Sequence, residues 1–360
     1  MDKALMDGLY DLSRLDQKEK VSLLMFLGQP IDGNDPFDSL LQAARIYRNT
    51  NEQELDTISS PSGTRFPVVD TEGLYVRHAY KDLCDKVAST FTDSPDTTYQ
   101  NRIVVAGTPG IGKSAFLLYF TIRLLAASND DNPPLVVFHT QEGSDCYVYG
   151  GISTVRQGKI DDFRLLLDLP ETWYLIDSSP NPALVQAKTI ISASPQILCP
   201  DSGRYQDVLK ETPQLHYMAP WEFDELETCR VCVRSFNVVG QDLMKRLYFK
   251  IGGVPRYVLH SPANTLGRDR NDFAGAESKA LYRVQLALNN AKGPLTLLQY
   301  LAQKGESLEF SSHLLHRWPT NDHADYHLRW ATNYIKMELV EGLGDESWIV
   351  LLKAMQMGLM

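Results

Sequence analysis

The sequence has no long hydrophobic run, few cysteines and a deficit of positive charge. Its longest apolar stretch, from Ala115 to Ile122, is stopped by Arg123 and is far shorter than the roughly 20 residues that cross a bilayer, so no membrane partner is expected. The N-terminus carries acids and no apolar core of signal-peptide length, so nothing in it directs secretion. A net charge of −10 excludes a broadly basic surface that would coat nucleic acid.

The cysteines are an odd and scattered set: Cys84, Cys146, Cys199, Cys229 and Cys232. Such a set fits a reducing intracellular compartment better than a disulfide framework. The one close pair, Cys229 and Cys232, is a lone CxxC in a predicted helix. Zinc requires two more ligands and no matching pair exists, so we interpret the pair as ordinary half-buried thiols rather than as a zinc or redox site.

Apolar patterning predicts strands that alternate with helices. Short β-branched or aromatic runs predict strands at 103–106, 135–139, 173–176, 189–192 and 215–218. Helical stretches are expected at 12–27, 36–47, 75–91, 115–127, 223–237, 241–251 and 278–290. Strands that alternate with helices predict a parallel α/β sheet, and the fading of the strand signal after Trp221 predicts a helical second part.

One run of residues matches the phosphate-binding pattern GxxxxGK[ST] completely: Gly107, Thr108, Pro109, Gly110, Ile111, Gly112, Lys113 and Ser114. It follows a predicted strand and precedes a predicted helix, as the pattern requires. Its glycines let successive N–H groups turn toward phosphate oxygens, and the helix N-terminus adds partial positive charge. We expect Lys113 to reach the β- and γ-phosphates and the Ser114 hydroxyl to bind the metal. The predicted cofactors are ATP and Mg²⁺.

A second strand is expected to supply an acid for the magnesium ion. The bulky run from Trp173 to Ile176 is followed directly by Asp177, which fits this role. Many ATPases place a glutamate next to orient the attacking water, whereas Ser178 and Ser179 follow here. The missing carboxylate predicts slow hydrolysis or a base supplied from elsewhere.

Two residues are candidates for sensing the γ-phosphate. Ser194 follows the strand predicted at 189–192, and Arg256 begins a predicted helix after two glycines. An arginine there would stabilise the charge of the γ-phosphate. The alternatives are a plain strand end and a solvent-facing arginine at a helix corner. Arg204 and Arg230 are further candidates for an arginine finger offered to a neighbouring copy.

Four histidines cluster late in the chain, in pairs spaced three and four apart: His313, His316, His323 and His327. A metal site is one interpretation. Polar helix surface is the other, and it is favoured because no HExxH glutamate is present and Trp318 and Pro319 separate the pairs. The stretch 323–339 has helical spacing of its aromatic residues and predicts core packing of a C-terminal helical subdomain.

The motifs occur in a recognisable order: GLYVRHAY from Gly73, then GTPGIGKS, WYLID, ISASP, YMAPWEFDEL and GGVPRYVL. Together they resemble the Crinkler and retrotransposon-hot-spot group of P-loop NTPases over 75–259. The resemblance implies an AAA+/STAND-like fold, with a parallel sheet flanked by helices and with helical N-terminal and C-terminal regions. It also implies that Gly107 to Ser114 is the phosphate loop, Asp177 the magnesium acid and Arg256 a second sensor.

The predicted division is a helical N-terminal region at 1–60, a P-loop NTPase core at 61–220, a helical lid at 221–290 and a C-terminal helical subdomain at 291–360. Crinkler-like proteins are modular, and the resemblance implies a secreted effector that acts in the host nucleus or cytoplasm. No header motif of the Leu-Phe-Leu-Ala-Lys type occurs near the start, and no nuclease pattern of spaced Asp, Glu and Lys follows Leu308.

The leading hypothesis is an ATP-binding NTPase module with slow hydrolysis, or a nucleotide switch that controls engagement of a partner. One alternative is a DNA-cleaving effector gated by the NTPase. Another is an assembly protein whose oligomeric state depends on nucleotide without turnover. The expected partners are a nucleoside triphosphate, a host protein or DNA, and further copies of the same chain.

Overall fold

The computed structural model of the chain describes residues 15–50, 56–61, 63–92, 101–129, 131–140, 145–177, 182–194, 206–210, 212–291 and 311–341. The chain divides into two compact units, each built from separate segments. The first comprises Met1–Val104, Ser114–Ser192 and Asp207–Gln214, and the second comprises Val105–Lys113, Ala193–Gln206 and Leu215–Met360. The four-part division expected from the sequence stays a prediction.

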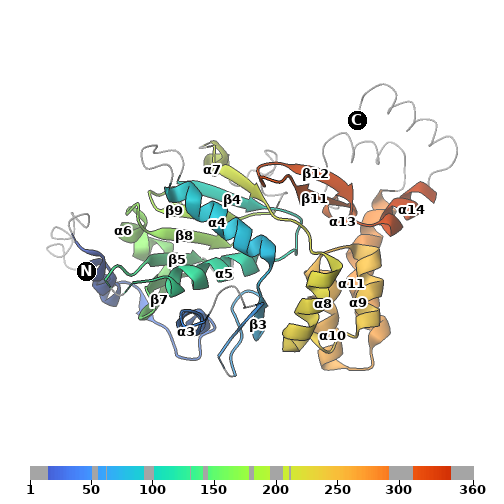
Figure 1. Ribbon diagram of the computed structural model, residues 1–360, viewed down its shortest axis with the longest axis horizontal. Helices are drawn as coiled ribbons and strands as arrows, with labels where there is room; N and C mark the ends of the chain where they lie inside the picture. Colours follow the sequence, from blue (N-terminus) through green and yellow to red (C-terminus); the bar gives the residue numbers. More distant parts are fainter. Residues whose placement is uncertain are drawn as a thin grey trace. The chain divides into compact units, whose positions relative to one another are not determined.

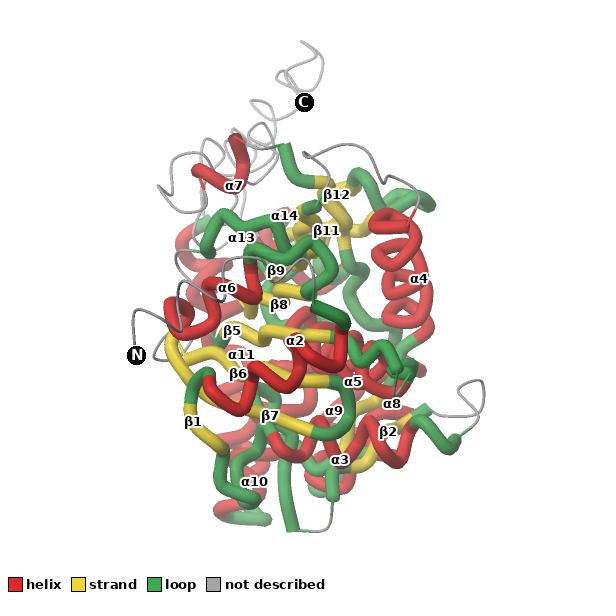
Figure 2. The backbone as a smooth tube through the Cα atoms, turned by 90° about the vertical axis from the view of Figure 1, so that its left-hand side faces the viewer, coloured by secondary structure: helices red, strands yellow, loops and turns green. Residues whose placement is uncertain are grey.

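An eight-stranded sheet has the strand order β1-β7-β6-β5-β8-β9-β4-β10, and Figure 2 shows the strands from β1 to β9 in this order. Its strands are β1 (Gln29–Pro30), β4 (Arg102–Ala106), β5 (Leu135–His139), β6 (Asp145–Gly150), β7 (Thr154–Lys159), β8 (Trp173–Asp177), β9 (Lys188–Ser192) and β10 (Gln214–Tyr217). All five strands expected from the sequence are present, and they are neighbours in the sheet as β5, β8, β9, β4 and β10. Every residue of β4 and β5 is buried, as a continuous apolar run predicts.

The sheet is mixed: it contains the parallel strands expected from the sequence and an antiparallel extension that was not expected. Strands β5, β8 and β9 are parallel, but β6 and β7 form an antiparallel extension on β5, and β1 pairs antiparallel with β7. Strand β7 reads TVRQGK and buries only Val155. A strand with so little apolar content gives no signal to sequence analysis, so the extension was not predicted.

Two long helices of the first unit lie side by side on the sheet. Tyr80 of α4 (His78–Thr92) contacts Phe116 of α5 (Lys113–Ala126), with ring centroids 5.9 Å apart. Trp173 at the start of β8 meets Phe91 of α4 at 5.2 Å and Phe120 of α5 at 5.4 Å. Both helices therefore cover the same face near Trp173 (Figure 1).

The remaining short elements before β10 complete this part of the chain. They are α2 (Gln17–Leu23), η2 (Leu24–Phe26), α3 (Asp38–Tyr47), η4 (Ile160–Phe163), α6 (Arg164–Leu167), α7 (Gln206–Lys210) and a two-stranded sheet of β2 (Thr57–Ser59) and β3 (Gly73–Tyr75). Helix α2 begins after Asp16, whose carboxylate accepts the Glu19 N–H at 2.8 Å, as a capping box does. Helix α3 is held to the sheet because the Tyr149 hydroxyl donates to the Phe37 carbonyl at 2.9 Å.

The second unit is rich in helices: α8 (Phe223–Cys232), η6 (Arg234–Phe236), α9 (Gln241–Ile251), the π-helix η7 (Arg256–His260), α10 (Ser261–Arg268), α11 (Phe273–Asn290), α13 (Ser311–Leu314) and α14 (Asn333–Glu341). Figure 1 shows α9 beside α11, and Lys250 and Arg246 of α9 both pair with Glu277 of α11, at 3.0 and 3.2 Å. The helices expected after Trp221 are therefore present, although the one expected at 223–237 is interrupted after Cys232.

An antiparallel hairpin lies where the sequence predicts helix. Strand β11 (Leu315–Pro319) pairs with β12 (Tyr326–Trp330), so the expected helix over 323–339 is wrong for its first part, and α14 begins only at Asn333. Alternating residues in β12 are exposed and partly exposed. Over so few residues, periods of two and of 3.6 are hard to distinguish.

No helix in the described ranges is long and apolar enough to span a membrane. Three cysteines of the described chain are buried thiols, Cys84, Cys146 and Cys229, and Cys232 is an exposed one. Burial raises the pKa of the Cys146 thiol to about 12. Cys199 lies outside the described residues.

Candidate nucleotide-binding site

The loop after β4 has the backbone that its glycines allow. Gly107, Gly110 and Gly112 have φ values of 148°, 84° and 99°, which side-chain-bearing residues rarely adopt. A Cβ at Gly107 would also lie 2.8 Å from the Met218 carbonyl oxygen. The sequence prediction of a glycine-dependent turn before a helix is therefore met by the geometry, since α5 begins at Lys113.

Lys113 turns back into this loop. Its ammonium donates to the carbonyl oxygens of Gly107 at 2.8 Å and Thr108 at 3.2 Å, and the residue is only 7% exposed. A buried cation at the N-terminus of a helix suits an anionic ligand. The residues present thus fit a phosphate chain, with Lys113 as the charge that would meet it.

Ser114 and Asp177 come together in the first unit. The Ser114 hydroxyl donates to the Asp177 carboxylate, with 2.7 Å between Oγ and Oδ1. Asp177 ends β8 and is 4% exposed. A hydroxyl and a carboxylate are the hard oxygen donors that Mg²⁺ takes alongside substrate phosphates. These two residues, separated in sequence, have the chemistry expected for the predicted metal pair.

A serine that sequence analysis did not select lies opposite Asp177. In the parallel pairing of β8 and β9, Asp177 is directly across from Ser192, and Ser192 is buried. The predicted sensor, Ser194, is half-buried and lies two residues beyond the end of β9. The run Ile191 to Ser194 contains both serines, and only the strand register distinguishes them.

Arg256 lies next to the loop through its backbone. Its N–H donates to the Gly110 carbonyl at 3.3 Å, and a Cβ on Gly110 would stand 2.9 Å from the Arg256 Cβ. The residue starts η7, as the sequence predicts a helix to start there, and its side chain is exposed. The structure thus brings Arg256 next to Gly110 of the loop in the second unit.

Trp221 also holds the loop and was not predicted to do so. Its indole N–H donates to the Ile111 carbonyl at 2.6 Å, and its backbone N–H donates to the Gly253 carbonyl at 2.9 Å. A buried Trp needs a partner for its N–H, which is the only hint that the sequence offers. Trp221 therefore connects the phosphate loop to the Gly253 segment that leads into η7.

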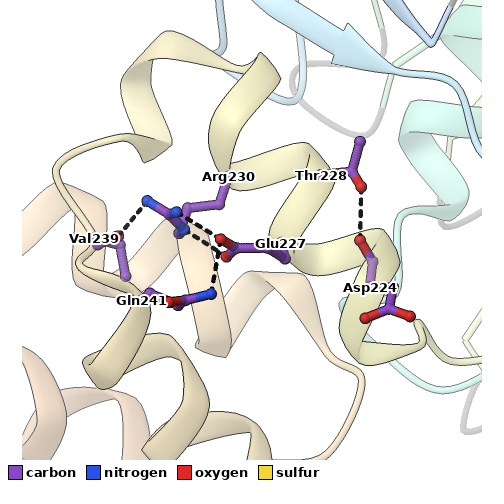
Figure 3. Close-up of polar contacts among 6 residues, drawn as sticks. All are labelled: Asp224, Glu227, Thr228, Arg230, Val239 and Gln241. Carbon is purple, nitrogen blue, oxygen red and sulfur yellow. Dashed lines mark hydrogen bonds and ion pairs between the residues drawn. The ribbon is translucent and has the colours of Figure 1, made fainter.

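Arg230 is engaged within its own chain (Figure 3). Its guanidinium makes two 2.7 Å bonds to Glu227, and the Val239 carbonyl lies at 3.4 Å. Gln241 donates to the same carboxylate at 3.1 Å, and the hydrogen bond from Arg230 lowers the pKa of Glu227. Offering Arg230 to a neighbouring copy would break this bidentate pair. Arg204 lies outside the described residues.

The histidine cluster is divided between different environments. His313 and His316 are poorly accessible, and burial lowers the pKa of His313 to about 4 and that of His316 to about 3. His323 lies with its Nδ1 2.9 Å from the Tyr217 carbonyl oxygen, and His327 is exposed. In the described part of the chain, no three His, Cys, Asp or Glu side chains are grouped to hold a metal ion.

Together these features define the class of protein. A strand, the loop GTPGIGKS and a helix follow one another in the order that the phosphate-binding pattern requires. The end of a second strand places Asp177 beside Ser114. The chain has the α/β fold of P-loop NTPases, with a mixed sheet flanked by helices.

Comparison with known proteins gives a weak sequence similarity. Over 202 residues, or 54% of the chain, the sequence is 26% identical to Crinkler effector protein 15 and to Crinkler effector protein 16 of Phytophthora infestans. The chain spans 29% of the length of each. The expected likeness to Crinklers is thus found over about half of the chain. No protein-family model matches the chain.

Among solved structures, the chain is similar to the RuvB Holliday junction branch migration motor of Thermotoga maritima. The TM-score is 0.36 and the identity 12%, over 70% of this chain and 92% of that one. A variant of the same motor gives a TM-score of 0.36 over 69% and 91%. A TM-score at this level adds no argument about fold or function.

Proposed function

We propose that this chain binds ATP with Mg²⁺ at the loop from Gly107 to Ser114 and works as a nucleotide switch with slow hydrolysis. The observation that carries the proposal is the 2.7 Å hydrogen bond between Ser114 and Asp177. It joins the last residue of the predicted phosphate loop to the predicted magnesium acid, although neither motif specifies the other. A glycine turn that had formed by chance would not be expected to end beside a buried carboxylate.

Different residues of the chain would bind the phosphates and the metal ion. Backbone N–H groups of the loop and the Lys113 ammonium would bind the β- and γ-phosphates. Ser114 and Asp177 would hold Mg²⁺, directly or through water, and the ion would supply charge neutralisation on the phosphate oxygens. Ser192, directly across from Asp177, would orient a water or a phosphate oxygen beside the metal.

Slow turnover is supported by the two residues after Asp177. They are Ser178 and Ser179, so no carboxylate is supplied there to position the attacking water. Because water positioning is a large part of this catalysis, the bound triphosphate would persist. A long-lived bound state suits a switch better than a motor.

The switch would act through the helices that contact the loop. Trp221 and Arg256 donate hydrogen bonds to the carbonyls of Ile111 and Gly110. A change of the loop conformation on binding nucleotide would therefore shift the start of η7 and the segment at Gly253. The second unit would then present a different surface to a partner. The similarity to Crinkler effectors and the motif order of the Crinkler and retrotransposon-hot-spot group support an effector role in a host nucleus or cytoplasm, with a host protein or DNA as partner.

The test is ATP binding by isothermal titration calorimetry with Mg²⁺ present. Lys113→Ala should lose at least about 30-fold in affinity, because a charge-assisted contact to phosphate is removed. The matched control is Lys245→Ala, since Lys245 is an exposed lysine on α9, and it should bind as the parent does. Equal affinity in the parent and in Lys113→Ala, with both folded by melting temperature, would defeat the proposal.

A further inference from the structure

The outer edge of the C-terminal hairpin lies against the phosphate loop within the second unit. The backbone N–H of Arg317 in β11 donates to the Thr108 hydroxyl at 3.3 Å, and Thr108 is buried. The hairpin turn is fixed separately, because Tyr217 N–H donates to the His323 carbonyl at 2.8 Å and His323 Nδ1 lies 2.9 Å from the Tyr217 carbonyl oxygen. The hairpin is therefore held at two places, by β11 at the phosphate loop and by its turn at the end of β10.

The Arg317 side chain is nearly inaccessible in this position. The residue is 6% exposed, and its guanidinium lies 5.0 Å from the centroid of the Tyr326 ring. Among the described residues, neither an ion pair nor a side-chain hydrogen bond is formed by Arg317. A buried charge is costly unless it is paired, and an aromatic face offsets only part of that cost.

The other arginine of the hairpin shows what is unusual about Arg317. Arg329 in β12 makes the same kind of contact, 5.2 Å above the Trp318 ring, but it is exposed, so water solvates its charge. Arg317 pairs with Leu328, and Arg329 pairs with His316, which places the two arginines on opposite faces of the hairpin. Of the two arginines, Arg317 is the buried one, and it lies on the strand that contacts the loop.

We propose that Arg317 binds a phosphate oxygen of the nucleotide held by the phosphate loop, so that the C-terminal hairpin completes the site. The inference rests on the proposed function, because the anion is that nucleotide. Three observations converge on it: the contact of β11 with Thr108, the low exposure of Arg317 and the absence of an ion-pair partner in the described chain. An arginine at this place would also make nucleotide binding depend on a docked hairpin.

The experiment compares four folded variants for binding of Mg·ATP and of inorganic pyrophosphate by calorimetry. Arg317→Met removes the charge and keeps a flexible apolar stem that packs well on a ring. Arg317→Lys keeps a charge without the guanidinium fork. Arg329→Met is the matched control, and Lys113→Ala reports on the phosphate loop itself. Melting temperatures without ligand complete the comparison.

We expect Arg317→Met to weaken both ligands about 10- to 100-fold, as loss of a charged hydrogen bond does. Arg317→Lys should fall between this variant and the parent, and Arg329→Met should bind like the parent. Without ligand, Arg317→Met should melt no lower than the parent, because replacing an unpaired buried charge with an apolar side chain is neutral or stabilising. A purely structural arginine would lower that melting temperature.

The outcomes separate the two proposals. Loss of binding in Lys113→Ala with parental affinity in Arg317→Met and Arg317→Lys would overturn the role of Arg317 and leave the proposed function standing. Weaker ATP binding with unchanged pyrophosphate binding would overturn the phosphate contact. If Arg317→Met does not fold, Arg317→Lys decides the matter. Parental affinity for Mg·ATP in Arg317→Lys would overturn the guanidinium contact, and reduced affinity would support that contact. Equal binding in the parent and Lys113→Ala would remove the proposed function and this inference with it.

Discussion

Ser114 at the first turn of α5 and Asp177 at the end of β8 share a hydrogen bond of 2.7 Å across 63 positions of sequence. The bond leaves a carboxylate that is almost wholly buried beside a helix N-terminus. The hydroxyl and the carboxylate place two hard oxygen donors close together, as a magnesium ion would require.

The first prediction concerns the charge of Asp177. Asp177→Asn keeps the size of the side chain and an oxygen that accepts from Ser114, but removes the negative charge that favours Mg²⁺. We expect the gain in ATP affinity on adding Mg²⁺ to fall by about 10-fold or more, with affinity in EDTA within about twofold of the parent. Fluorescence titration with and without Mg²⁺ measures both values.

The control for that prediction is Asp168→Asn. Asp168 follows α6 in the same unit and is exposed, so its charge should not matter to the metal. An unchanged magnesium effect in Asp177→Asn would mean that another residue holds the ion.

The second prediction distinguishes Ser192 from Ser194. Because Ser192 is directly opposite Asp177 in the strand pairing, Ser192→Ala should lower the rate of ATP hydrolysis about 10-fold, as loss of a positioned donor does, with little change in affinity. Ser194, beyond the end of β9, should tolerate alanine with a change of less than about threefold. Single-turnover hydrolysis assays compare the two. A larger loss in Ser194→Ala would restore the serine chosen from sequence alone.

The features predicted correctly from sequence share a local signal. Strands β4, β5 and β8 are mostly apolar and β9 is a short β-branched run, and such runs predict buried strands. The phosphate loop was predicted because eight consecutive residues specify it. In both cases the information lies within a few neighbouring residues.

The features that were missed depend on distant residues. Strand β7 buries only Val155 and has little apolar content. The strands β11 and β12 are too short for the period of their apolar residues to distinguish strand from helix. The contacts of Trp221 with Ile111 and of Arg317 with Thr108 join residues that are 110 and 209 positions apart in sequence. No local pattern encodes such contacts, so they were found only in the folded chain.

The third prediction concerns the contact between Trp221 and Gly253. A Cβ on Gly253 would lie 1.9 Å from the Trp221 carbonyl oxygen, which is backbone and cannot rotate away. Gly253→Ala should therefore separate the two segments and lower the free energy of unfolding by about 1–3 kcal/mol. Nucleotide binding should weaken as well, because Trp221 also bonds the loop at Ile111.

Gly267→Ala is the control. Gly267 lies in α10 with nothing near its would-be Cβ, so alanine there should be neutral or stabilise by about 0.5–1 kcal/mol. Urea unfolding measures both variants. Equal stability of Gly253→Ala and the parent would show that the close approach is not needed for the fold.

The fourth prediction is a dependence of stability on pH that comes from His316. Burial lowers its pKa to about 3, with His313 nearby as a second cause, whereas an unfolded histidine has a pKa of about 6.5. Between these values the unfolded chain binds a proton that the folded chain does not. The free energy of unfolding should therefore fall as the pH drops below about 6.5, by up to about 1.4 kcal/mol per pH unit for this residue.

Urea unfolding from pH 4.5 to 7.5 tests this, with His316→Gln compared to the parent. The difference in free energy between the two should shrink as the pH falls below about 6.5, because the variant has lost one of the protons that unfolding takes up. The control variant is His327→Gln, because His327 is exposed. Its free energy of unfolding should depend on pH as steeply as that of the parent. Parallel pH profiles for the parent and His316→Gln would mean that His316 binds its proton equally in the folded and unfolded chains, and is therefore not held neutral by its burial.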